Sequence, residues 1–126
     1  MEIPTAAKTL LEHKGRDIWT ISPKATVYQA IQMMSEKNIG ALPVVEGNRL
    51  VGIISERDYM SKVALHGKSS KETPVGEIMT RDPVTVGPAQ TVSECMEIIT
   101  EHRVRHLPVL DGDELLGIVS IGDLVK

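Results

Sequence analysis

The feature that most constrains this chain is a nine-residue pattern that occurs twice, at residues 50–58 and 115–123. Each copy is an apolar run with β-branched residues, typical of a buried strand, and ends in Ser-x-x-Asp, typical of a helix N-terminus. A strand that leads directly into a helix presents backbone N–H groups and the positive end of a helix dipole, which together favour an anion such as phosphate. The pattern therefore predicts two similar places for a ligand that carries a phosphate group.

The repetition extends over most of the chain. When the sequence is aligned with itself, Pro23 falls on Pro88, a shift of 65 positions, and the alignment needs no gap from Thr20 to Asp58. Each half then predicts a β-α-β-β-α order of elements. Neither half can bury both faces of a small sheet alone, so we expect an α/β (α+β) fold in which two pseudo-symmetric repeats pack sheet to sheet, with binding clefts between them.

Local signals set the expected boundaries. The first repeat is expected at 6–65 and includes an N-terminal helix with Thr5 as its N-cap and Gly15 at its end. Residues 66–74 are polar and turn-rich and form the expected connector, and the second repeat follows at 75–126. The patterns further predict a strand at 18–21, helices that begin at capping boxes of Thr26 and Thr91, an antiparallel hairpin of 41–45 with 50–54, and a helix from 56 to about 65.

Composition excludes several classes of function. The 126 residues carry a net charge of −3 with acidic and basic side chains interspersed, which argues against a protein that coats DNA or RNA. The single cysteine, Cys95, excludes an internal disulfide and thiol-based zinc sites, and its place on an apolar helix face indicates a core residue. The histidines lack the spacing of metal ligands, and no nucleophile with its base, pair of carboxylates or redox centre indicates an enzyme.

The expected cellular location follows from two further absences in the sequence. No stretch is long and apolar enough to cross a membrane, and the N-terminus lacks the basic and apolar regions of a signal peptide. We therefore expect a cytoplasmic protein with no membrane or nucleic-acid partner, no metal and no required cofactor.

The order of elements, the Leu-Pro-Val after the first helix of each repeat, and the steps Gly-Ile-Ile-Ser-x-x-Asp and Gly-Ile-Val-Ser-x-x-Asp together resemble a tandem pair of cystathionine-β-synthase (CBS) domains. The connector and the Arg-His-Leu-Pro run at 105–108 are similar to those of short, stand-alone CBS proteins without a catalytic domain. The resemblance implies a regulatory module that binds an adenine nucleotide, with AMP expected first and ATP, ADP or NAD as alternatives. It also implies a homodimer and an unidentified protein that the module regulates.

Asp58 and Asp123 each follow a serine, Ser55 or Ser120, by three residues. One interpretation is structural, because a capping box stabilises the start of a helix by about 1 kcal/mol. The resemblance implies a second role, in which the carboxylate accepts hydrogen bonds from both hydroxyls of a ribose. The two roles are compatible, since the serine can cap the helix while the carboxylate faces a cleft.

Basic residues near these steps differ between the repeats. Arg57 lies inside the first Ser-x-x-Asp step, where a guanidinium would clamp a phosphate, whereas the second step has Gly122 in its place. The second repeat has instead Arg105 and His106 at the junction of a helix and a strand. The resemblance implies that these two side chains point toward phosphates near the centre of the module. The alternative interpretation for all three is an exposed, solvated basic side chain.

An adenine ring requires an apolar slot with a few backbone donors and acceptors. By resemblance the lining residues are Ile21, Ile39, Ala41, Val86 and Val104, although such residues are equally typical of a core. Thr20 and Lys24, on either side of Ile21, complete the set of expected ligand contacts.

Two hypotheses on function therefore stand side by side. A shift in melting temperature with AMP or ATP would support a nucleotide sensor, whereas no shift across the adenine series would favour a dimerising interaction scaffold with no nucleotide ligand. If nucleotide binds, we expect the cleft with Asp58 to fill first. The reason is that Arg57 adds a charge-assisted hydrogen bond worth roughly 1.5–3 kcal/mol.

Overall fold

The computed structural model describes residues 5–15 and 17–125. It divides into two compact units that interleave along the chain. The central unit is Trp19–Pro83, and the terminal unit combines Met1–Ile18 with Val84–Lys126. The structure thus groups the N-terminal helix with the second half of the sequence, whereas the boundaries 6–65, 66–74 and 75–126 follow the repeat along the chain and stay a prediction.

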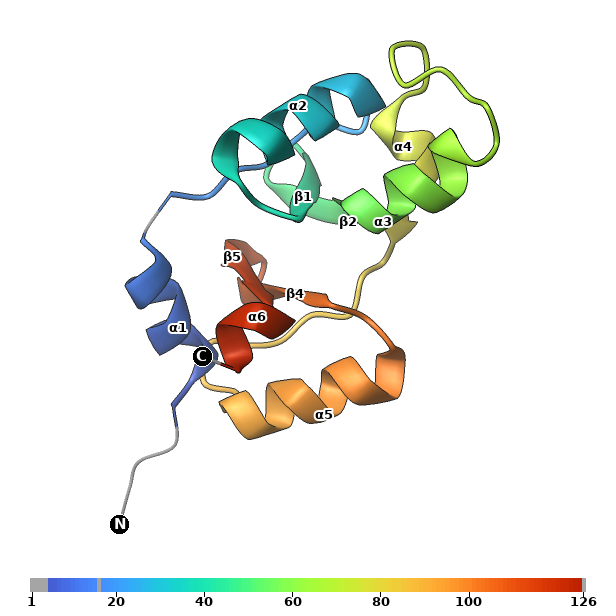
Figure 1. The fold of residues 1–126 in the computed structure, drawn as a ribbon. Helices are drawn as coiled ribbons and strands as arrows, with labels where there is room; N and C mark the ends of the chain where they lie inside the picture. Colours follow the sequence, from blue (N-terminus) through green and yellow to red (C-terminus); the bar gives the residue numbers. More distant parts are fainter. Residues whose placement is uncertain (1–4, 16, 126) are drawn as a thin grey trace. The chain divides into compact units, whose positions relative to one another are not determined.

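The central unit contains a three-stranded antiparallel sheet in the order β1-β2-β3. Its helix α2 begins at a complete capping box of Thr26 and Gln29, and it ends at Asn38, which has the left-handed conformation with φ 55°. Val27, Ala30 and Met34 recur at helical spacing and are buried in the core of this unit. The elements of this unit are α2 (Val27–Lys37), β1 (Ala41–Glu46), β2 (Arg49–Ser55), α3 (Glu56–Asp58), η1 (Tyr59–Ala64), α4 (Val75–Ile78) and β3 (Thr80–Arg81). Figure 1 labels all of them except η1 and β3.

The terminal unit contains a two-stranded antiparallel sheet, β4-β5. Helix α5 begins at a capping box of Thr91 and Glu94, and it buries Cys95 and Ile99 in a second, separate core. The elements of this unit are α1 (Ala7–Lys14), α5 (Val92–His102), β4 (His106–Asp111), β5 (Glu114–Ser120) and α6 (Ile121–Leu124) (Figure 1).

The two hairpins have the same register, as the sequence repeat predicts. Ala41 pairs with Ser55 in β1-β2, and His106 pairs with Ser120 in β4-β5. Each hairpin also shifts register at the equivalent place, after Val44 and after Val109. The predicted class of fold, two similar α/β repeats with a small sheet each, is confirmed, while the expected packing of one sheet against the other stays a prediction.

A second correspondence between the units involves α1 and α4. The N–H of Val92 donates to the carbonyl of Thr5 at 2.9 Å, and the N–H of Val27 donates to the carbonyl of Thr73 at 2.8 Å. Thr5 thus corresponds to Thr73, a shift of 68 positions, instead of the 65 that relates the rest of the repeats. Helix α1 therefore occupies in the terminal unit the place that α4 occupies in the central unit.

Three local predictions differ from the structure. The N-cap of α1 is Ala6 and carries no side-chain cap bond, because the backbone of Thr5 is engaged with α5. The strand expected at 18–21 is reduced to one parallel bridge between Ile21 and Val44, since the side chain of Trp19 is exposed and Pro23 soon ends the extended segment. The helix expected from 56 to about 65 begins as α3 and continues as the π-helix η1.

Candidate ligand-binding site

In both units the second hairpin strand ends at a serine that caps the following helix. The N–H of Asp58 donates to Oγ of Ser55 at 3.2 Å, and the N–H of Ser55 donates to Oδ2 of Asp58 at 2.9 Å. The corresponding distances for Asp123 and Ser120 are 3.1 and 2.8 Å. The capping-box interpretation of both steps is therefore confirmed, and the ribose role of the two carboxylates stays a prediction.

Each capping aspartate also forms an ion pair with a lysine. Oδ1 of Asp58 lies 2.9 Å from Nζ of Lys62, which also donates to the carbonyl of Ile78 at 2.9 Å. Oδ2 of Asp123 lies 2.8 Å from Nζ of Lys14, which also donates to the carbonyl of Ile118 at 3.1 Å. The two carboxylates are 13% and 15% exposed, so a nearby cation offsets much of the cost of removing them from water.

Neither lysine is predicted from the sequence. Lys62 could have been found, because it follows Asp58 by four residues on a predicted helix, the spacing of a helical ion pair. Lys14 left no local signal, because 109 positions separate it from Asp123.

The surroundings of Asp123 change its acidity. Burial alone raises the pKa of this carboxyl, but hydrogen bonds from Lys14 and Ser120 favour the ionised form more strongly. The net pKa of Asp123 lies below its ordinary value of 3.8, so the carboxylate is ionised at neutral pH.

The predicted basic residues lie beside these helix starts. The side chain of Arg57 is exposed and forms no hydrogen bond or ion pair within residues 5–15 and 17–125. In the terminal unit the carbonyl of Arg105 accepts a hydrogen bond from the N–H of Ile121 at 2.9 Å. Since His106 pairs with Ser120, Arg105 and His106 lie at the start of α6 in their own unit. That their side chains contact a phosphate bound at the Asp58 step stays a prediction.

The residues predicted to line an adenine slot fall into two groups, one in each unit. Ile21 and Ala41 belong to the central unit and are 7% and 2% exposed, and Val86 belongs to the terminal unit and is 2% exposed. The half-buried residues Ile39 and Val104 pack against the two cores, Thr20 is half-buried, and Lys24 is exposed. Most of these residues therefore belong to a core or pack against one, and any contact of theirs with a ligand stays a prediction.

The comparison with known families identifies the repeats. The model of the CBS domain matches residues 5–65 and again residues 75–126. This chain is a member of the CBS-domain family. The predicted tandem pair of CBS domains is thus confirmed, and the two Ser-x-x-Asp steps are equivalent positions of the two CBS repeats.

Relatives of this CBS pair include one protein of a plant and two of bacteria. A mitochondrial CBS domain-containing protein of Arabidopsis thaliana, CBSX3, is 40% identical over 132 residues, which cover 97% of this chain and 64% of that protein. A solved CBS-domain protein of Burkholderia ambifaria is 52% identical, with a TM-score of 0.92, and the match covers 97% of this chain and 92% of that chain. A hexameric CBS-CP12 protein of bloom-forming cyanobacteria is 31% identical, with a TM-score of 0.90, over 99% of this chain and 72% of that chain.

Two observations bear on the location of the protein. Among the helices that the structure describes, none has the length and apolar character needed to cross a bilayer. The Arabidopsis relative is named as mitochondrial, and the cytoplasmic location expected for this CBS pair stays a prediction.

Proposed function

We propose that this CBS pair is a regulatory, non-catalytic module that binds an adenine nucleotide at its two Ser-x-x-Asp steps, with AMP preferred and ATP, ADP or NAD as alternatives. The observation that carries the proposal is the recurrence of one arrangement in both units. Each unit has a capped helix start opposite the beginning of a hairpin strand, with an arginine beside it, Arg57 or Arg105. Membership of the CBS family supports a role in regulation by ligands.

In this proposal the parts of the nucleotide are held by different residues. Asp58 and Asp123 accept hydrogen bonds from the ribose hydroxyls, because an ionised carboxylate offers several lone pairs to two donors at once. Arg57 and Arg105 bind phosphate oxygens through their planar guanidinium groups. His106 adds a donor near Ser120, and the half-buried Ile39 and Val104 contribute apolar surface for the base.

Two features of the structure make opposite predictions about which Ser-x-x-Asp step binds the nucleotide more tightly. Arg57 lies within the Asp58 step and favours that step, as the sequence analysis predicts. Both carboxylate oxygens of Asp58 are already engaged, by Ser55 and Lys62, so a ribose at this step must compete with Lys62. For Asp123, by contrast, the contacts with Nζ of Lys14 and the N–H of Ser120 are both made by Oδ2, which favours the Asp123 step. We propose that Arg57 decides the order and that the Asp58 step fills first.

Calorimetric titration with AMP tests this proposal. Asp58→Asn is expected to remove the tighter binding event and Asp123→Asn the weaker one, while Arg57→Ala weakens the tighter event about tenfold, the value of one charge-assisted hydrogen bond. Arg49→Ala is the matched control, because Arg49 is also exposed but begins β2, whereas the Ser-x-x-Asp step lies at the other end of that strand. The assignment of the steps is wrong if Asp123→Asn abolishes the tighter event and Asp58→Asn leaves it intact.

A second candidate function is that of a dimerising scaffold that binds no nucleotide, and it is supported by signs of self-association. The side chains of Met60, Leu65 and Val125 are 60%, 81% and 67% exposed, and a partner molecule could cover such apolar surface. The cyanobacterial relative is hexameric, which also supports self-association. We propose a homodimer that docks a regulated protein, and sedimentation should give a species of twice the chain mass. If no adenine nucleotide raises the melting temperature of that dimer, the scaffold is the better account.

A further inference from the structure

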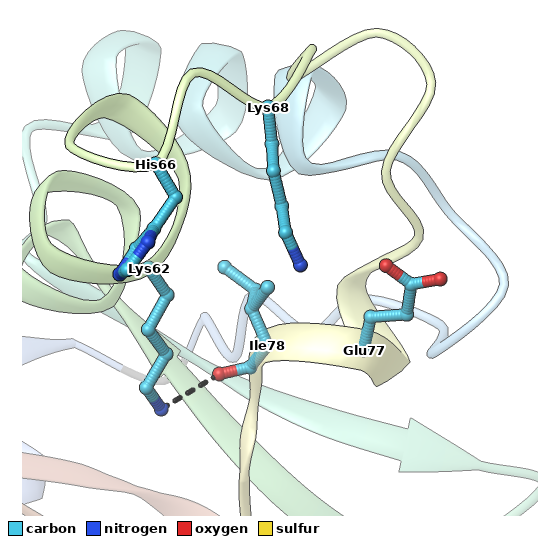
Figure 2. A pocket seen from close by; sticks show the side chains of 5 residues that line it. All are labelled: Lys62, His66, Lys68, Glu77 and Ile78. Atoms are coloured by element: carbon cyan, nitrogen blue, oxygen red, sulfur yellow. Dashed lines mark hydrogen bonds between the residues drawn. The ribbon is translucent and has the colours of Figure 1, made fainter.

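A pocket of about 270 Å³ lies within the central unit, between the end of η1, the connector and α4. Its lining residues are Lys62, His66, Lys68, Glu77 and Ile78. Figure 2 shows that the side chain of Lys68 extends from the connector toward Ile78, while Lys62 and His66 stand on one side and Glu77 on the other. Three side chains that can carry positive charge therefore surround an opening with a single carboxylate.

The hydrogen-bonding capacity of these groups is only partly used. Lys62 forms an ion pair with Asp58 and donates a hydrogen bond to the carbonyl of Ile78, and these two contacts hold its ammonium group in place. The side chains of His66 and Lys68 form no hydrogen bond or ion pair with any residue that the structure describes. The pocket thus presents a fixed ammonium group and two uncommitted basic side chains.

We propose that this pocket binds the phosphate group of a small phosphate ester, as an anion site additional to the two Ser-x-x-Asp steps. Lys68, His66 and the ammonium group of Lys62 supply donors to the phosphate oxygens, and a phosphate dianion matches several donors better than a singly charged group does. Glu77 repels the phosphate but accepts a hydrogen bond from a hydroxyl on the same ligand. The ligand class is therefore a phosphate with a neighbouring hydroxyl.

The size of the pocket restricts the ligand further. A volume of about 270 Å³ is below the roughly 300–1,000 Å³ of pockets that enclose drug-sized molecules. It suits a phosphate on a short hydroxylated carbon chain. The proposal does not depend on adenine nucleotide binding, because Lys68 and Glu77 belong to neither Ser-x-x-Asp step.

Calorimetry with inorganic phosphate, glycerol 3-phosphate and glycerol tests the pocket. Both phosphates should bind the wild-type protein saturably, glycerol 3-phosphate more tightly, and glycerol should not bind. Lys68→Ala should weaken both about tenfold, the loss of one charge-assisted hydrogen bond. Lys71→Ala removes the same charge from the same connector but not from the pocket, since Lys71 lies over the ring of Tyr28, and it should change binding by less than about twofold.

Glu77→Gln gives a test in the opposite direction. Removal of this negative charge should strengthen the binding of inorganic phosphate and reduce the preference for glycerol 3-phosphate. The proposal is overturned if wild-type protein shows no saturable phosphate binding, or if Lys68→Ala and Lys71→Ala weaken binding equally. If Lys68 only complements the carbonyl end of η1, Lys68→Ala lowers the melting temperature without affecting phosphate binding, which also contradicts the proposal.

Asp58→Asn separates this proposal from the nucleotide proposal. The variant should lose one AMP binding event and keep the phosphate site, because Lys68 and His66 remain. If AMP does not bind but phosphate does, the proposed function is contradicted and the pocket is supported. If AMP binds but phosphate does not, the proposed function is supported and the pocket is contradicted.

Discussion

The central and terminal units hold the same aspartate in the same capping box but neutralise it with lysines of different origin. Lys62 comes from the next turn of the same helix, whereas Lys14 comes from α1, at the other end of the chain. When α1 is aligned with α4, Lys14 falls on Asp82, so the repeat itself supplies no lysine there. In both units a lysine offsets the cost of burying the carboxylate, and the topology of each unit decides which lysine does so.

The neighbour of the second hairpin strand also differs between the units. In the central unit β3 pairs with β2, with Thr80 opposite Ile53 and Arg81 opposite Gly52. In the terminal unit α1 remains helical to Lys14, and the ammonium group of Lys14 donates to the carbonyl of Ile118 on β5. The neighbour of β2 is therefore a hydrogen-bonded backbone strand, β3, whereas the neighbour of β5 is a helix that contacts it through side chains.

Among the variants that test this difference between β2 and β5, Gly52→Ala is expected to destabilise the protein most. A Cβ at Gly52 would lie 2.7 Å from Sδ of Met79 and 2.8 Å from the backbone oxygen of Thr80, and the latter cannot move without disturbing β3. Gly52→Ala should lower the free energy of unfolding by about 2 to 3 kcal/mol.

Two alanine variants in the terminal unit serve as comparisons in urea unfolding. A Cβ at Gly117 would lie 2.9 Å from the movable end of Leu11, although the φ of +154° adds a backbone cost, so Gly117→Ala should cost less than Gly52→Ala. At Gly122 the nearest atom is 3.6 Å away, so Gly122→Ala should be neutral or stabilise α6 by up to about 1 kcal/mol. Equal losses of unfolding free energy for Gly52→Ala and Gly117→Ala would contradict the idea that the neighbour of β2 is more rigid than that of β5.

A smaller effect is expected when each lysine loses its charge. Lys14→Met should lower the free energy of unfolding by about 1 kcal/mol, because Lys14 joins α1 to both β5 and α6. Lys62→Met should cost less, since both lysines lose one hydrogen bond to a backbone carbonyl, but the ion pair of Lys62 joins residues four apart on one helix and is worth about 0.3–0.5 kcal/mol. Chemical denaturation of both variants measures the difference, and a larger loss for Lys62→Met would show that the long-range ion pair of Lys14 is the weaker one.

The smallest effect is a dependence of stability on pH through Asp123. Its pKa is lowered in the folded protein, so its contribution to stability is complete above the ordinary value of 3.8 and is lost as pH falls through the folded-state pKa. Unfolding followed between neutral and strongly acidic pH should show this loss. Lys14→Met should flatten that part of the profile, because the hydrogen bond and charge of Lys14 would no longer lower the pKa of Asp123. An unchanged acid limb in Lys14→Met would show that Lys14 does not set the acidity of Asp123.

Short-range features of the fold could be read from the sequence because their partners are close along the chain. The capping boxes at Thr26, Thr91, Ser55 and Ser120 each join residues three apart, and all four form as predicted. The hairpins share a register because the repeat places equivalent apolar residues opposite one another. The serines and aspartates of the candidate site were identified for the same reason.

Only the tertiary structure decided which segments far apart in the sequence meet. The relation of α1 to α4 follows a shift of 68 positions, and of the aligned stretches 5–11 and 73–79 only the threonines are identical, so no sequence pattern indicated it. The ion pair of Lys14 with Asp123 depends on that placement of α1. The pocket of Lys62, His66 and Lys68 likewise forms only where η1, the connector and α4 converge. Hydrophobic periodicity records which face of an element is buried, but it does not record which distant element covers that face, and this choice is made by packing.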